Sequence, residues 1–187
     1  MNVSHKMVGW WLCLILATAG SPRAQENSTQ DLQKSCRNFV QEFYNWYVRL
    51  LKKNSKADPL DLRREAFDAE LRRQLKAYDG ASHDGVGLLD FDPFVNGQDF
   101  SPVGYSAGEV TRKNDRYFVN VYCLGGCWGD GANKRLLLII PELLYKDGKW
   151  RFMNFHYRFP DGSKGDLLSI LKADRKADPK AYRKGSE

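Results

Sequence analysis

Residues 134–159 carry two β-rich runs on either side of the turn 146–149, which reads Lys-Asp-Gly-Lys. Asp-Gly between such runs is a strong hairpin signal, because both turn positions need a positive φ. The run before the turn is apolar at both alternating sets of positions, which are Leu136, Leu138, Ile140 and Leu144 in one set and Leu137, Ile139 and Leu143 in the other. A strand of this kind is expected to be covered on both faces. The pattern therefore predicts this hairpin as the centre of an antiparallel sheet.

The strands around the hairpin follow from the same period of two. Two strands are expected over 105–112 and 117–124, before the hairpin. In the last strand Trp150 and Phe152 share one phase, whereas Phe155, Tyr157 and Phe159 share the other. A β-bulge near residues 153–154 would return all five to one face and point His156 away from them. A short closing helix is expected over 166–173.

Helical spacing dominates the chain before residue 80. A first helix, capped by Ser28 or Thr29, is expected to run to about Lys53 with an aromatic stripe on one side and charged residues on the other. A second helical region begins with Asp58 as its cap, has a break over 64–66, and stops at residues 79–80. Helices first and then a meander of about four strands predict an α+β fold, with N-terminal helices packed on one face of an antiparallel sheet.

The N-terminal residues have the organisation of a secretory signal peptide. A positive start precedes an apolar run over 7–19, and cleavage is expected after Ala19 or Ala24. An uncleaved membrane anchor is the alternative. The resulting division is a signal peptide over 1–24, one α+β domain over 25–175 and a flexible polar tail over 176–187. The protein is thus expected to be periplasmic or secreted, with membrane contact during export only.

Cleavage would leave three cysteines in an oxidising compartment. Cys36 lies within the apolar stripe of the first helix and is expected to be a buried thiol, so Cys123 and Cys127 are the predicted disulfide. The formal net charge of +6 is mild and includes two cations of the leader, Lys6 and Arg23. Nucleic-acid binding, which needs a dense basic stripe, is therefore not expected.

Three motifs stand in an order that resembles a known family. They are Phe43-Tyr44-Asn45-Trp46-Tyr47, then Asp92-Pro93-Phe94 with Gln98-Asp99-Phe100, and finally Asp147-Gly148-Lys149-Trp150-Arg151-Phe152 ending in His156-Tyr157. Over about residues 36–172 the chain is similar to the bacterial domain-of-unknown-function family 3828, of the nuclear-transport-factor-2-like superfamily. The resemblance implies a cone-like fold, in which a long helix and a helical pair pack into a strongly curved antiparallel sheet. It also implies export, and it implies no assigned activity.

Two local motifs suggest chemistry that their context disfavours. Residues 104–108 match G-x-S-x-G, but a nucleophile elbow needs a helix after the serine and a strand-like run follows here. Asp90, Asp92 and Asn96 suggest a calcium loop, but Phe94 occupies a ligand position, so turn chemistry is the better explanation. The cysteines and histidines have no zinc-site spacing. Neither a metal nor a cofactor is expected.

Folds of this kind often bind a molecule between helix and sheet. The candidates for such a pocket are Trp46, Tyr47, Asp92, Phe94, Gln98, Asp99, Trp150, His156 and Tyr157. The aromatic members could equally fill the core. The predicted function is an exported, non-catalytic module that binds an envelope protein or a small ligand. The alternatives are a small pocket enzyme of the lyase or isomerase type, which would use Asp99 or His156, and a purely structural envelope protein.

Overall fold

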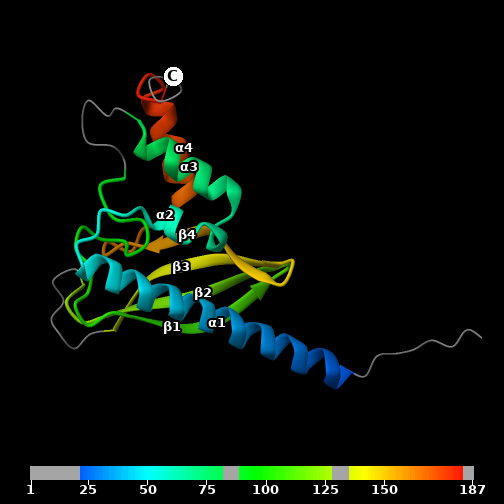
Figure 1. Cartoon of the computed structure of the whole chain (residues 1–187). Coiled ribbons are helices and arrows are strands. Elements are labelled where there is room, and N and C mark those ends of the chain that lie inside the picture. Colours follow the sequence, from blue (N-terminus) through cyan, green and yellow to red (C-terminus); the bar gives the residue numbers. More distant parts are fainter. Residues whose placement is uncertain (1–21, 82–88, 128–134, 183–187) are drawn as a thin grey trace, which may run out of the picture.

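The computed structural model describes residues 22–81, 89–127 and 135–182, with side chains from residue 29 onward. In chain order the elements are α1 (Pro22–Lys52), α2 (Pro59–Leu62), the short 3₁₀ helix η1 (Arg64–Ala66), α3 (Ala69–Asp79), β1 (Tyr105–Lys113), β2 (Arg116–Leu124), β3 (Arg135–Lys146), β4 (Lys149–Arg158), β5 (Lys164–Asp166) and α4 (Leu167–Ala177). The strands described form one open antiparallel sheet in the order β1-β2-β3-β4-β5. In Figure 1, α1 crosses the β1–β2 half of this sheet, and α3 and α4 lie together beyond β4. The predicted α+β fold is confirmed, with one more strand than expected.

The central hairpin forms as its turn residues require. Asp147 has a φ of 53° and Gly148 a φ of 74°, and β3 and β4 pair on either side of them. Glu142 pairs with Asn154 whereas Leu143 pairs with Phe152, so Met153 is an extra residue in β4. The predicted bulge is therefore confirmed, and it brings the aromatic residues on both sides of it onto the same buried face.

The prediction that β3 is covered on both faces is wrong. Ile139 and Leu143 are fully buried on the face that carries the core, whereas Ile140 and Leu144 keep part of their surface exposed. The helices described pack against the sheet through α1 on β1 and β2, and through α3 and α4 on β4. An apolar run on both alternating sets therefore does not distinguish a doubly covered strand from one with a half-exposed apolar face.

The helical segments are set by their caps. Asp58 accepts a hydrogen bond from the Leu60 N–H at 2.7 Å, and Asp68 does the same for Glu70 at 2.9 Å. Between these caps η1 provides the predicted break. The expected cap at residues 28–29 is wrong, because α1 is already helical from Pro22. The signal-peptide prediction falls on residues 1–24, and residues 1–21 lie outside the described part of the chain.

The C-terminal segment is more ordered than its composition suggests. Helix α4 continues past the expected end at residue 173 to Ala177. Beyond it Ala181 is 4% exposed, and the Tyr182 hydroxyl donates to Asp174 Oδ2 at 2.5 Å. Ala181 and Tyr182, which belong to the tail predicted to be flexible from residue 176, thus contact the rest of the fold. Residues 183–187 of that tail lie outside the described range.

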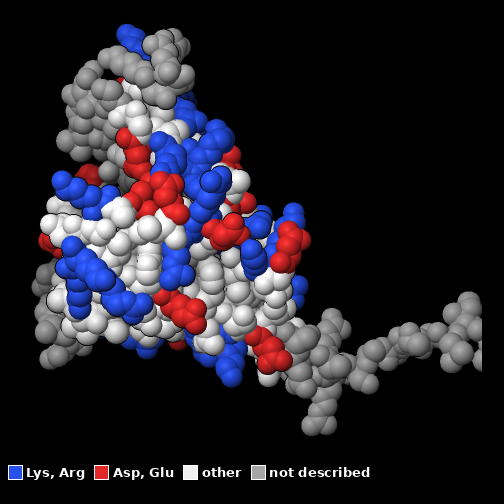
Figure 2. Space-filling model, in the orientation of Figure 1, with Lys and Arg blue, Asp and Glu red and all other residues white. Residues whose placement is uncertain are grey.

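The core is a set of aromatic rings between α1 and the sheet. Phe43 is at its centre, with ring contacts to six neighbours, which are Tyr44, Trp46, Tyr47, Phe67, Phe94 and Phe152. On the face shown in Figure 2, basic and acidic side chains are interspersed over the helices. None of the helices in the described ranges is long and apolar enough to cross a membrane.

Candidate functional site

The loop over residues 89–104 is closed on itself by a tight turn. The Asp92 N–H donates to the Gly97 carbonyl at 3.0 Å, and the Asp92 carbonyl accepts from the N–H groups of Val95 and Asn96. Asp92 Oδ1 also accepts from the Phe94 N–H at 2.8 Å. The turn chemistry expected for this stretch is confirmed, and the carboxylate of Asp92 is part of it.

Asn96 fastens this turn to the sheet. It is 0% exposed, and its Nδ2 donates to the Leu138 carbonyl and to the Arg158 carbonyl, each at 3.2 Å. Leu138 is the extra residue of a bulge between β2 and β3, which explains why its carbonyl is available. Both partners are acceptors, so only the amide nitrogen can face them. Asn96 Oδ1 is consequently left without a hydrogen-bond partner among the described residues.

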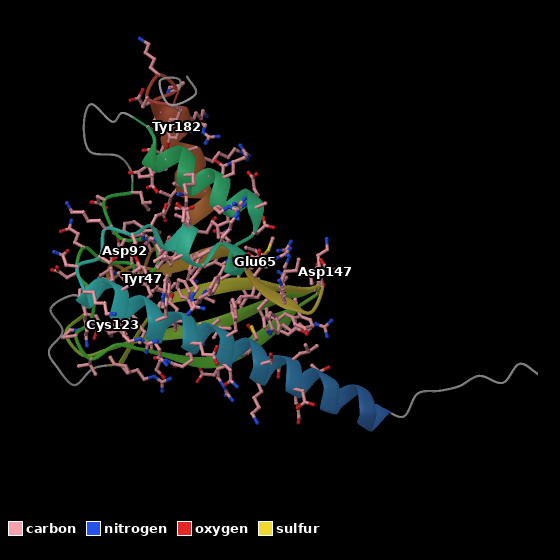
Figure 3. All side chains as sticks on the ribbon, in the orientation of Figure 1. Tyr47, Glu65, Asp92, Cys123, Asp147 and Tyr182 are labelled. Atoms are coloured by element: carbon pink, nitrogen blue, oxygen red, sulfur yellow. A yellow bond between two sulfur atoms is a disulfide. The ribbon has the colours of Figure 1, made fainter. Side chains whose placement is uncertain are left out.

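Tyr47 of α1 and Asp92 of the turn are labelled near each other in Figure 3, and their side chains form a hydrogen bond. The Tyr47 hydroxyl donates to Asp92 Oδ2 at 2.6 Å. Burial raises the pKa of Asp92, while the hydrogen bonds from Tyr47, Phe94 and Val95 act in the opposite direction. Burial, followed by the Asp92 charge, raises the pKa of the Tyr47 hydroxyl. The carboxylate is engaged by these donors, so the pair serves chiefly to hold the turn against α1.

Changing Tyr47 to phenylalanine should lower the free energy of unfolding by about 1.5–3 kcal/mol at pH 7, because a hydrogen bond to an ionised group is lost. The pKa of Asp92 should rise in this variant, so the deficit relative to wild type should grow as the pH rises through that pKa and shrink below it. Urea unfolding at pH 3 and pH 7 measures both quantities. Tyr145→Phe, at a more exposed tyrosine, is the matched control. Equal deficits at the two pH values would contradict a bond to the ionised carboxyl.

A cavity of about 770 Å³ lies beside the turn. It is lined by residues of the 89–104 loop, of the segment after β2, of β3, of the segment after β4, of β5 and of α4. Its apolar walls are Phe91, Val95, Leu138, Phe159 and Ile170, and its polar lining is Asp90, Asn96, Gln98, Asp99 and Lys164. An apolar interior with a few polar groups is typical of small-molecule sites.

The predicted pocket residues are distributed over several places. Gln98 and Asp99 are exposed at the rim of this cavity. Tyr47, Asp92 and Phe94 line a second cavity of about 460 Å³, which shares Phe91 with the first.

The remaining candidates lie away from the large cavity. The Tyr157 hydroxyl donates to the Pro93 carbonyl at 2.9 Å, which supports the turn from the sheet side. Trp46 lies under the Arg63 guanidinium, 4.9 Å from the ring centroid. Trp150 donates to Ser35 at 3.0 Å, towards the other end of α1. Trp150 and Tyr157 belong to the buried core, and Trp46 packs against it.

His156 lies on the sheet face opposite the aromatic core. Its Nε2 is 3.0 Å from Glu142 Oε2, and its ring contacts Phe118. The phase argument predicted this orientation. His156 and Asp99 therefore do not share a cavity and cannot act as a catalytic pair. The matching G-x-S-x-G residues also lack an elbow, because Ser106 lies within β1.

Cys123 and Cys127 are a close pair at the edge of the large cavity. Their Cα atoms are 6.3 Å apart, within the range that a disulfide spans, and Cys127 contributes to the lining. Cys36 is a buried thiol, as predicted, and burial raises its pKa to about 12. In the described ranges, no group of three or more His, Cys, Asp or Glu is placed to hold a metal ion.

Asn96 was not among the predicted pocket residues, although it belongs to the stretch for which turn chemistry was expected. No nearby residue pointed to its role, because its hydrogen-bond partners are backbone carbonyls 42 and 62 residues away along the chain. No protein-family model, curated protein or solved structure matches this chain.

Proposed function

We propose that the protein is an exported binding module of the bacterial envelope, whose ligand is a small molecule held in the large cavity. The observation that carries this proposal is a cavity of about 770 Å³ next to a fully buried asparagine, whose carbonyl oxygen has no hydrogen-bond partner within the described part of the chain. Its volume falls within the range of about 300–1,000 Å³ that is usual for small-molecule sites. A buried oxygen of this kind is rare in folded proteins unless a ligand or a water molecule donates a hydrogen bond to it.

Two sequence features and one structural feature support export. The first 24 residues have the pattern of a signal peptide, and the ordered motifs resemble family 3828, whose members are typically exported. The closeness of Cys123 and Cys127 supports a disulfide, which an oxidising compartment would preserve. A disulfide there would fix one wall of the cavity.

The second candidate is a small pocket enzyme of the lyase or isomerase type. Asp99 favours it, because its carboxylate lies at the rim of the cavity, whereas His156 is on the other face of the sheet. An enzyme that used Asp99 would lose turnover in the Asp99→Asn variant while its fold was preserved. A binding module would lose little more than the contribution of one rim charge.

Mass spectrometry of the protein recovered from the exported fraction tests the proposal. The native spectrum should contain an adduct of small mass that denaturation removes. The denatured mass should correspond to cleavage after Ala19 or Ala24, with two hydrogens fewer than the reduced chain. An uncleaved chain would contradict export, and a full set of free thiols would contradict the disulfide. A bare native mass would count against a retained small ligand and favour a protein partner.

A further inference from the structure

The walls of the large cavity favour a ligand with a large apolar part. Phe91, Phe159 and Ile170 pack against the core but stay partly exposed and line the cavity, and the buried residues Val95 and Leu138 complete its apolar lining. The Cβ that an alanine would add at Gly165 would lie 3.3 Å from the Phe159 ring and 3.8 Å from Ile170. The absence of a side chain at Gly165 therefore keeps this part of the cavity open.

The buried polar group of the cavity is an acceptor. The side-chain nitrogen of Asn96 donates hydrogen bonds to two backbone carbonyls of the sheet. These two acceptors fix the orientation of the amide. Its Oδ1 can only accept a hydrogen bond. This oxygen is covered by neighbouring atoms in the structure, so a ligand in the cavity would have to displace them to reach it, and it would then have to bring an N–H or O–H group.

The charges at the mouth favour a cation. Asp90 and Asp99 are both exposed at the rim, and among the described lining residues Lys164 is the one cation. The N-terminus of α4, which could have held an anion, is already satisfied. Asp166 Oδ1 accepts from the Ser169 N–H at 3.0 Å, and Asn154 Oδ1 accepts from the Leu168 N–H at 3.2 Å.

From these three features we infer that the cavity takes an amphiphilic amine, with an apolar body against the aromatic walls and an ammonium group held by acceptors. The inference rests on the proposed function and names its ligand class. The full sequence carries a formal net charge of +6, and it stays positive when Lys6 and Arg23 of the predicted leader are left out, so the long-range field would draw an anion. A preference for an amine must therefore come from the local site.

Isothermal titration of the purified mature protein with four probes on one carbon skeleton tests this inference. The probes are 4-phenylbutylamine, 4-phenylbutan-1-ol, the methyl ether of that alcohol, and 4-phenylbutanoic acid. The amine should bind about tenfold more tightly than the alcohol, and the alcohol more tightly than the ether, which has no donor. The acid should bind more weakly than the alcohol. The double variant Asp90→Asn/Asp99→Asn should reduce the advantage of the amine and leave the alcohol nearly unchanged.

Two cavity-filling variants locate the binding. Gly165→Val and Ile170→Trp should each weaken the amine at least tenfold, and Thr111→Val, on the exposed part of β1, should not. Circular dichroism checks folding, and the second filling variant serves if the first does not fold. Tighter binding of the acid, no binding of any probe, or amine binding unaffected by both fillings would overturn the inference. The native mass spectrum decides the proposed function independently, because an adduct there requires only that some small ligand is retained.

Discussion

Changing Phe152 to alanine should lower the free energy of unfolding by about 3–5 kcal/mol, which is a large part of the stability of a typical domain. Phe152 is 0% exposed, and its ring centroid lies 5.2 Å from Phe39, 4.8 Å from Phe43, 5.6 Å from Phe67 and 5.1 Å from Phe155. These rings belong to α1, to the segment after η1 and to β4. Truncation would leave a cavity where three parts of the fold meet.

Urea unfolding followed by circular dichroism measures this loss. Leu62→Ala, at a side chain that is 53% exposed, is the control and should change stability by less than about 0.5 kcal/mol. The Phe152→Leu variant should lie between the two, because it retains most of the apolar volume. A loss in Phe152→Ala no larger than that of the control would show that the aromatic core does not hold the helices to the sheet.

The hairpin and its bulge were predictable because local chemistry determines them. Asp-Gly requires two positive φ angles, and the aromatic residues of β4 change phase at Met153, where the extra residue lies. Strand β5 has three residues, too few for a period of two to be recognised. Helix α1 begins earlier than expected, because a favourable cap residue such as Ser28 can also lie within a helix when the residues before it are helical.

The candidate site was only partly predictable. The mixture of buried-type residues and acids over 89–100 singled out Asp92, Phe94 and Asp99, which line two cavities in the structure. What the pattern could not supply was the identity of the partners. Asn96 donates to backbone carbonyls of distant strands. Every residue has a backbone carbonyl, so the sequence does not indicate which ones Asn96 will bind. The cavity likewise depends on how β5 and α4 return beside the loop, which is a property of the tertiary fold.

Changing Asn96 to aspartate should lower the free energy of unfolding by about 3–5 kcal/mol at pH 7. The change replaces the buried amide nitrogen with a carboxylate oxygen facing the carbonyls of Leu138 and Arg158, so an uncompensated charge is buried against two acceptors. The matched control is Asn114→Asp, which makes the same change at a similar φ, 59° against 53°, but on an exposed turn. It should cost less than about 0.5 kcal/mol.

The pH dependence separates the buried charge from a loss of shape. Burial should raise the pKa of the new carboxyl above its value in the unfolded chain, so the folded variant binds the extra proton between the two pKa values. As the pH rises from the pKa of the unfolded chain to the higher pKa of the folded variant, the variant should therefore lose stability relative to wild type. Below the lower of the two pKa values it should recover stability, because a protonated carboxyl can donate to one carbonyl. Urea titrations of both variants from pH 3 to pH 7 measure this. A deficit at Asn96 that does not depend on pH would show that the side chain holds the turn by its shape, and that its two hydrogen bonds contribute little.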